Sequence, residues 1–262
     1  MGNLIGTALH AFECWTRMGK KYRISSRSAL LWWFAPVLVS SSHALQVNQG
    51  DMGRAMLLGE FTSMSTLYSV IPDLVPEPLG WDVYASEAGA YFFLCAFRKI
   101  TGSVPGERSG DEANDLVESE LERIHFTKKI AKFHRNAVSP SGKFGFPVPT
   151  YQGNLPQDTT ECDTWEESFT RRIQRMFELE GASQGYDPEM KQLRKAIVDK
   201  VIPRLLRPLE TDGRGIVPCL VHGDLWDGNT GIDADTRQPV IFDACSSYAH
   251  HECKRRYSPA RT

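Results

Sequence analysis

The sequence predicts an α+β protein with two lobes, a small mixed lobe first and a larger, mainly helical lobe after it. Three observations support this class. A buried strand is indicated by the apolar run 91–97, which follows a proline-rich turn. Apolar residues recur at helical spacing over 126–137, 165–176 and 190–201. Two further short apolar runs, 219–221 and 239–242, each end in an acidic loop.

Composition is that of an ordinary globular protein. The chain has 262 residues, of which 41% are hydrophobic and 24% charged, enough for a sizeable core. A formal net charge of -2 gives no electrostatic basis for nucleic-acid binding. The apolar run 29–39 is too short to span a bilayer, so no membrane association is expected. Six cysteines without CxxC spacing indicate free thiols and a cytoplasmic protein. Nothing in the sequence indicates an oligomeric state.

The elements follow in order along the chain. Residues 51–70 suit a helix that carries Glu60, 91–97 a buried strand, and 112–137 one or two helices. The stretch 142–157, rich in Gly, Pro and aromatic residues, predicts a long ordered loop whose aromatic residues either line a ligand site or anchor the loop to the core. The stripes over 165–176 and 190–201 predict two helices with core-facing sides.

The segment 217–243 carries the chemistry. Asp224, Asn229 and Asp243 each lie just past an expected strand end. A single Asp or Asn in a glycine-containing loop usually caps backbone amides, but this spacing and strand context favour function. Phosphoryl transfer needs a carboxylate that orients and deprotonates a hydroxyl, and oxygen ligands for magnesium. Asp224 is therefore the candidate base, and Asn229 and Asp243 are the candidate metal ligands. His222 is expected to steady the loop.

The Asp-to-Asn spacing is that of the protein-kinase catalytic loop, with His222-Gly223-Asp224 in place of His-Arg-Asp. At this point the chain resembles the kinase-like phosphotransferases of small molecules, and among them the fructosamine and ketosamine 3-kinase family, whose signature is close to HGDLWxGN. The resemblance covers residues 47–252 and includes the segments GRAMLLGEF (53–61), VPEPLGW (75–81), YFFLCAF (91–97), KFGFPVPTYQGNLPQ (143–157), TWEESF (164–169) and FDACSSYAHHE (242–252).

The resemblance implies a protein-kinase-like fold that transfers the γ-phosphate of ATP, with Mg²⁺, to the 3-hydroxyl of a ribulosamine or fructosamine. The acceptor would be a glycated protein or a small ketoamine. Residues 1–97 would form the nucleotide-binding lobe, and 98–262 the helical catalytic lobe with the catalytic and metal loops at 222–243. Glu60 would be the acidic partner of the lysine that grips the phosphates.

The amino-terminal part departs from the family pattern. Family members carry that lysine in a Phe-Leu-Lys-Val context, whereas this chain has Ala44-Leu45-Gln46-Val47. Gln46 would then replace the lysine at the cofactor site, which removes a positive charge and leaves Glu60 without its partner. Residues 18–46 match nothing in the family, so the small lobe is expected to be atypical.

The carboxyl end departs as well, because the family continues with further helices where residues 253–262 finish this chain. The large lobe is therefore expected to be truncated. Together the two departures suggest the hypothesis that residues 18–46 and 253–262 come from a mis-spliced transcript.

Parts of the sequence also fit three other functions. The first is a catalytically inactive relative that binds nucleotide or ketoamine without turnover, as Gln46 and the carboxyl end suggest. The second is an aminoglycoside or choline kinase, which shares the catalytic loop but not the matches at 75–81 and 143–157. The third is a two-metal phosphoesterase, because residues 223–227 fit GDxxD. That class also needs Asp-x-His and Gly-Asn-His, and neither triplet occurs.

Overall fold

The computed structural model describes residues 37–39, 43–85, 87–101, 113–185 and 187–251. Most of the atypical segment 18–46 and all of 253–262 lie outside these ranges. None of the described helices is long and apolar enough to cross a membrane. The described elements of the first part are β1 (Val37–Val39), β2 (His43–Gln49), α2 (Gly50–Val70), β3 (Pro78–Val83), β4 (Ala90–Ala96) and β5 (Ile100–Thr101).

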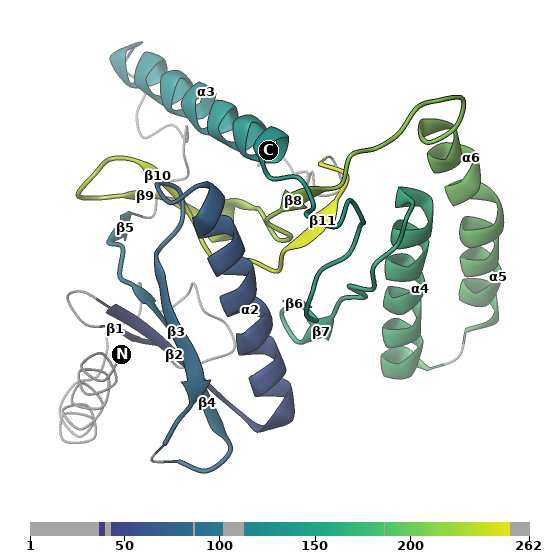
Figure 1. Cartoon of the computed structure of the whole chain (residues 1–262), viewed down its shortest axis with the longest axis horizontal. Helices are drawn as coiled ribbons and strands as arrows, with labels where there is room; N and C mark the ends of the chain where they lie inside the picture. Colours follow the sequence, from purple (N-terminus) through teal and green to yellow (C-terminus); the bar gives the residue numbers. More distant parts are fainter. Residues whose placement is uncertain (1–36, 40–42, 86, 102–112, 186, 252–262) are drawn as a thin grey trace.

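The first part is an antiparallel sheet with strand order β1-β2-β4-β3, and α2 lies along it (Figure 1). β4 is the expected strand of residues 91–97, and its central place explains why Phe93, Leu94 and Cys95 are buried. Gln46 of β2 pairs in register with Phe93. The predicted helix 51–70 is confirmed as α2, so Gln46 and Glu60 come from a strand and from the helix that directly follows it.

The second part begins with α3 (Ala113–Asn136), one continuous helix where one or two were expected. The strands after α3 form three small antiparallel sheets in the described part of the chain, in strand orders β10-β9-β5, β11-β8 and β6-β7, and β5 of the first part joins one of them. They bring the two expected acidic loops, after β8 and after β10, to one place. The strands are β6 (Tyr151–Gln152), β7 (Leu155–Pro156), β8 (Cys219–Val221), β9 (Thr230–Asp233), β10 (Pro239–Ile241) and β11 (Ser247–Ala249), with the 3-10 turn η3 (Asp227–Asn229).

The remaining helices lie side by side at one edge of the molecule (Figure 1). Leu193 and Val201, which were expected to face the core, are half exposed, so that prediction was wrong for the second stripe. An edge position gives these helices a neighbour on one side only, and a π-helical turn also interrupts the 3.6-residue period. These helices are α4 (Trp165–Gln184), α5 (Pro188–Ala196), the π-helix η1 (Ile197–Val201), α6 (Ile202–Leu206) and the 3-10 helix η2 (Arg207–Leu209).

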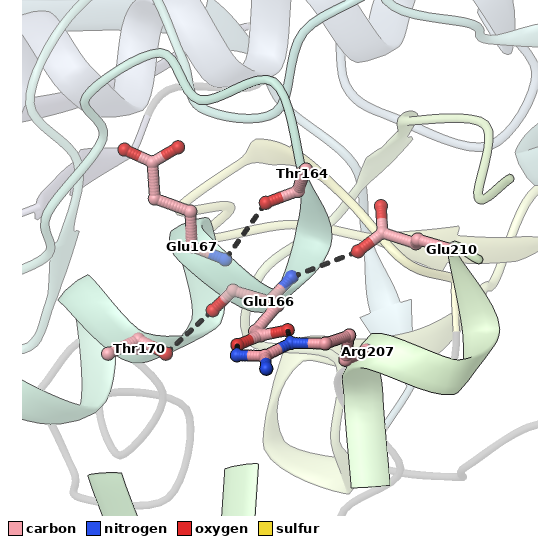
Figure 2. A network of polar contacts seen from close by, with 6 residues as sticks. All are labelled: Thr164, Glu166, Glu167, Thr170, Arg207 and Glu210. Atoms are coloured by element: carbon pink, nitrogen blue, oxygen red, sulfur yellow. Dashed lines mark hydrogen bonds and ion pairs between the residues drawn. The ribbon is translucent and has the colours of Figure 1, made fainter. Parts of the chain in front are cut away.

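The start of α4 is held by two acceptors (Figure 2). The Thr164 hydroxyl accepts from the Glu167 amide at 3.2 Å, and the Glu210 carboxylate accepts from the amides of Trp165 and Glu166 at 2.8 and 3.1 Å. Helix amino termini leave such amides without intrahelical partners, and a negative charge there is favourable. Arg207 adds a two-pronged ion pair to Glu166. The α4 start is thus fixed to η2.

A continuous hydrophobic core joins both parts of the molecule. Buried residues of α2 and β4, such as Leu57 and Phe93, pack in one cluster with Phe133 of α3 and with Leu220 and Ile241 beside the acidic loops. Phe144 and Phe146 of the 142–157 stretch are also buried, so these aromatics anchor the loop rather than line a ligand site.

Helix α2 touches the 142–157 stretch at Gly59, and this contact can be tested. A Cβ at Gly59 would lie 2.5 Å from the Pro149 carbonyl oxygen, whereas one at Gly181 of α4 would meet nothing within 4 Å. We expect Gly59→Ala to lower the free energy of unfolding by about 1–3 kcal/mol through overpacking. Gly181→Ala, the matched control, should raise it by about 0.5–1 kcal/mol. Urea unfolding measures both. Equal effects of the two changes would contradict the close contact.

Candidate active site

The loop after β8 turns sharply at Gly223. Gly223 has φ 93°, and a Cβ there would lie 1.9 Å from the Cys245 carbonyl oxygen. Only glycine adopts this backbone conformation without strain and leaves that space open. The Cys245 amide also donates to the His222 carbonyl at 3.0 Å. The two acidic loops therefore lie against each other through their backbones.

His222 links the same two loops through its ring. The side chain is buried, its Nε2 bonds the Phe242 carbonyl at 3.0 Å, and its Nδ1 accepts from the Asp224 amide at 3.3 Å. A carbonyl requires a donor and an amide requires an acceptor, so the imidazole is neutral with its proton on Nε2. This arrangement agrees with the expected loop-steadying role.

Asp224 is held at both carboxylate oxygens. Asn229 Nδ2 donates to the Asp224 backbone carbonyl at 2.9 Å and to Oδ2 at 3.3 Å. Gln152 Nε2, from the hairpin β6–β7, donates to Oδ1 at 2.6 Å. The five-residue spacing thus brings Asn229 onto the candidate base. With Nδ2 directed at Asp224, Asn229 Oδ1 is the end of this amide that can accept a cation.

Asp243 follows β10 with φ 59°, a left-handed conformation that Asp tolerates better than most residues. Burial, and to a lesser extent the nearby charge of Asp224, together raise the pKa of its carboxyl to about 6. Burial also raises the pKa of Glu60, on α2, well above its usual range. The charge of Asp243 adds to that rise, and a hydrogen bond from Gln46 opposes it. Carboxylates from α2 and from both acidic loops therefore interact in one buried place.

Gln46 lies beside Glu60, where the family resemblance predicts a lysine. The amide oxygen of Gln46 and Oε1 of Glu60 are both buried, and neither has a hydrogen-bond partner among the described residues. No cation of the described chain contributes to the shifted pKa of Glu60 or of Asp243. The five residues singled out from the sequence thus form one cluster with three carboxylates. Hydrogen bonds join Gln46 to Glu60 and Asn229 to Asp224, and Asp243 interacts through its charge with Glu60 and Asp224.

Two neighbours of this cluster were not predicted. Gln152 lies in the 142–157 stretch, but no sequence pattern distinguishes a hydrogen-bonding Gln from any other loop residue. Trp226 remains 47% exposed, and its ring lies against Gly228 beside the catalytic loop. The only sequence feature that pointed to Trp226 was its place within the HGDLW match.

The donor set suits magnesium held together with a nucleotide. No group of three His, Cys, Asp or Glu side chains in the described part of the chain is spaced to hold a metal ion. Mg²⁺ commonly takes only one or two carboxylates, with substrate phosphates and waters as its other ligands. Asp243 and the oxygen of Asn229 meet that requirement, and the unpartnered buried oxygen of Glu60 adds negative potential close by.

The raised pKa of Asp243 predicts a pH-dependent effect on stability. Because the folded pKa of about 6 exceeds the ordinary 3.8, the carboxyl contributes most stability below pH 3.8 and loses it as the pH rises through 6. Asn imitates the protonated form and tolerates the same backbone conformation. We therefore expect Asp243→Asn to stabilise the protein by about 1–3 kcal/mol at pH 7.5 and by much less at pH 4.5.

Thermal unfolding at the two pH values measures this effect. Asp212→Asn is the matched control, because Asp212 also has a positive φ, of 57°, but lies on an exposed turn. A pH-independent effect of Asp243→Asn would show that its carboxyl is not held in a costly environment.

Comparison with known proteins identifies relatives of this chain. The fructosamine kinase family model matches residues 113–255, which is more than half of the chain. Ketosamine-3-kinase of Mus musculus is 32% identical over 79% of this chain and 66% of its own length. A chloroplastic protein-ribulosamine 3-kinase of Oryza sativa subsp. indica is 29% identical over 78% of this chain and 52% of its own length. This chain thus spans about half to two thirds of the length of these relatives.

Solved structures agree in fold. Putative fructosamine-3-kinases of Thermobifida fusca and Haemophilus somnus superpose with a TM-score of 0.56 each, at 19% and 16% identity. Each superposition covers 83% of this chain, with 72% and 68% of the respective neighbour. The expected α+β fold is therefore confirmed. On the extent of the family-model match, with the fold in agreement, this chain belongs to the fructosamine kinase family.

Proposed function

We propose that this protein is an ATP-dependent phosphotransferase that acts on the 3-hydroxyl of a ketosamine, carried by a glycated protein or a small amine. The observation that carries the proposal is the meeting of Asp224, Asn229 and Asp243 in one partly buried cluster, held by hydrogen bonds between the two acidic loops. The acceptor class follows the names of the mouse and rice relatives.

Asp224 is the group that receives the acceptor's proton in this proposal. Its carboxylate is held at Oδ1 by Gln152 and at Oδ2 by Asn229. A carboxylate fixed in this way orients the attacking oxygen and accepts its proton as the bond to phosphorus forms. The residues contribute mainly position and charge, as phosphoryl transfer requires.

Asp243 and Asn229 Oδ1 would hold the metal. Magnesium with ATP would supply the phosphoryl group and neutralise charge on it. The chain itself keeps Asp243 buried near another carboxylate. An ionised carboxyl without a counter-charge is unfavourable there, so binding of a cation beside it is favoured. Glu60 strengthens this preference from α2.

We further propose the division of labour expected from the sequence. The part through residue 97, with Gln46 and Glu60, would hold the nucleotide, and the part from residue 98 would hold the acceptor and the acidic loops. The four described cysteines, all free and buried, support a reducing, cytoplasmic location. They are Cys95, Cys162, Cys219 and Cys245.

A second function is favoured by Gln46: binding of nucleotide or ketoamine without turnover. The neutral amide beside Glu60 provides no ammonium for the phosphates. A hydrogen bond to a charged group contributes roughly 1.5–3 kcal/mol, so its loss would lower binding or turnover about ten- to a hundredfold or more.

Asp224→Asn tests the proposed activity. Release of ADP is measured with ATP, magnesium and a ribulosamine or fructosamine, alongside aminoglycoside and choline acceptors. We expect the change to lower kcat by about 10²–10⁴-fold, because the amide cannot accept the proton. Asp235→Asn is the matched control on the exposed turn between β9 and β10 and should leave kcat unchanged. Full activity of Asp224→Asn would exclude the assigned role.

Gln46→Lys in the same assay separates the two functions. An active wild type that gains about ten- to a hundredfold in kcat/KM supports a kinase with a weakened phosphate grip. A wild type that binds nucleotide but turns over only after Gln46→Lys supports the binding protein. Activity that falls with the lysine would contradict the assignment of Gln46 to the nucleotide side.

A further inference from the structure

The hairpin β6–β7 has a fixed base. The Gln157 amide donates to the Thr150 carbonyl at 2.9 Å, and both residues are buried. Thr150 Oγ1 donates to the Ser246 carbonyl at 3.3 Å, and Gln157 Nε2 contacts Cys245 Sγ at 3.0 Å. The base of the hairpin is thereby attached to the segment that directly follows Asp243.

Arg172 of α4 reinforces this base from the other side. It bonds the Gln157 side-chain oxygen and donates to Ser247 Oγ at 3.0 Å. The hairpin, the segment after Asp243 and α4 therefore share one hydrogen-bond network, which fixes the position of the hairpin relative to the acidic cluster.

The tip of the hairpin reaches the other acidic loop. Tyr151–Gln152 pairs with Leu155–Pro156 through a tight turn in which Gly153 has φ 59°. Gln152 Nε2 donates to Asp224 Oδ1 at 2.6 Å, within the range of a charge-assisted hydrogen bond. The hairpin thus bridges the loops of Asp243 and Asp224.

The second end of the Gln152 amide makes no hydrogen bond to the described chain. Gln152 is only partly buried, and its Oε1 is not among the enclosed atoms that lack a partner, so it is open to solvent. Both amide ends are carried on one carbon, so Oε1 lies beside the Asp224 carboxylate. Two acceptor groups, the carboxylate and Oε1, are therefore adjacent at this point, and the best ligand for them offers two adjacent donors.

We propose that Gln152 makes the acceptor site selective for vicinal diols. Asp224 accepts the hydrogen bond of the reacting hydroxyl, Gln152 Oε1 accepts that of the neighbouring hydroxyl, and Gln152 Nε2 keeps the carboxylate in the orientation that serves both. Gln152 is a positioning and specificity residue in this inference, which rests on the proposed role of Asp224. A mono-alcohol would form only one of these two hydrogen bonds.

The test compares a fructose-derived ketosamine with its 4-deoxy analogue, which lacks the hydroxyl next to the reacting one. We expect wild type to show a three- to tenfold lower kcat/KM for the analogue, the usual effect of one neutral hydrogen bond. In Gln152→Met, which keeps the side-chain length, the kcat/KM values for the two acceptors should differ less than twofold. The KM for the ketosamine should change. Gln184→Met, an exposed glutamine of α4, is the matched control and should keep the wild-type ratio.

Two results would overturn the inference. One is an unchanged ratio in Gln152→Met with both acceptors slowed equally, which would mean that Gln152 only fixes the hairpin. The other is the absence of binding of either compound to wild type in calorimetry. Calorimetry also separates this inference from the proposed function. A diol preference in Kd that disappears in Gln152→Met, without phosphate transfer by wild type, would support the inference and contradict the transferase activity.

Discussion

One turn of α2, from Gly59 to Ser63, is the constraint on which the site depends. Gly59 permits close contact with the backbone at Pro149, and Ser63 Oγ accepts the Ser246 amide at 3.0 Å. Glu60 lies between these contacts and interacts with Asp243. The same helical turn therefore fixes both the base of the β6–β7 hairpin and the loop of the candidate metal ligand relative to the first sheet.

This arrangement is costly in electrostatic terms and is maintained by packing. Glu60 and Asp243 both have raised pKa values because they are buried near another carboxylate, and Gln46 supplies only a neutral donor. The surrounding cluster of apolar residues, including Leu57, Met64 and Ile241, provides the burial that keeps the loops closed around them. Such a balance is expected where a site is built to receive a cation rather than to stabilise the empty protein.

The sequence predicted the parts of this site that depend on spacing within short segments. Asp224 and Asn229 lie in one loop, and a spacing of five positions suffices to bring the amide onto the carboxylate. Helices α2 and α3 and strand β4 were also predicted, because each depends on residue types and their order within one short segment. The approach of Asp243 to Glu60 was not predicted, because no local pattern encodes an interaction between such distant segments.

Other features depend on tertiary context. Gln152 reaches Asp224 because a hairpin base is held by Ser246 and Cys245, and none of these contacts leaves a pattern in the sequence. The apolar stripe with Leu193 has helical spacing but lies at an edge, so periodicity predicted the helix correctly and its burial incorrectly. The aromatic residues of 142–157 could serve a ligand or the core, and only the packing shows that Phe144 and Phe146 belong to the core.

The central claim is that the buried carboxylates are poised to exchange protons for a metal-bound nucleotide. The most direct measurement is the calorimetric titration of the protein with preformed magnesium–ATP, at pH 6 and at pH 8, each in two buffers of different ionisation enthalpy. Because the pKa of Asp243 is about 6, the account predicts proton release on binding at pH 6 and little at pH 8. Binding without proton release at pH 6, or equal binding of ATP in the presence of a chelator, would contradict it.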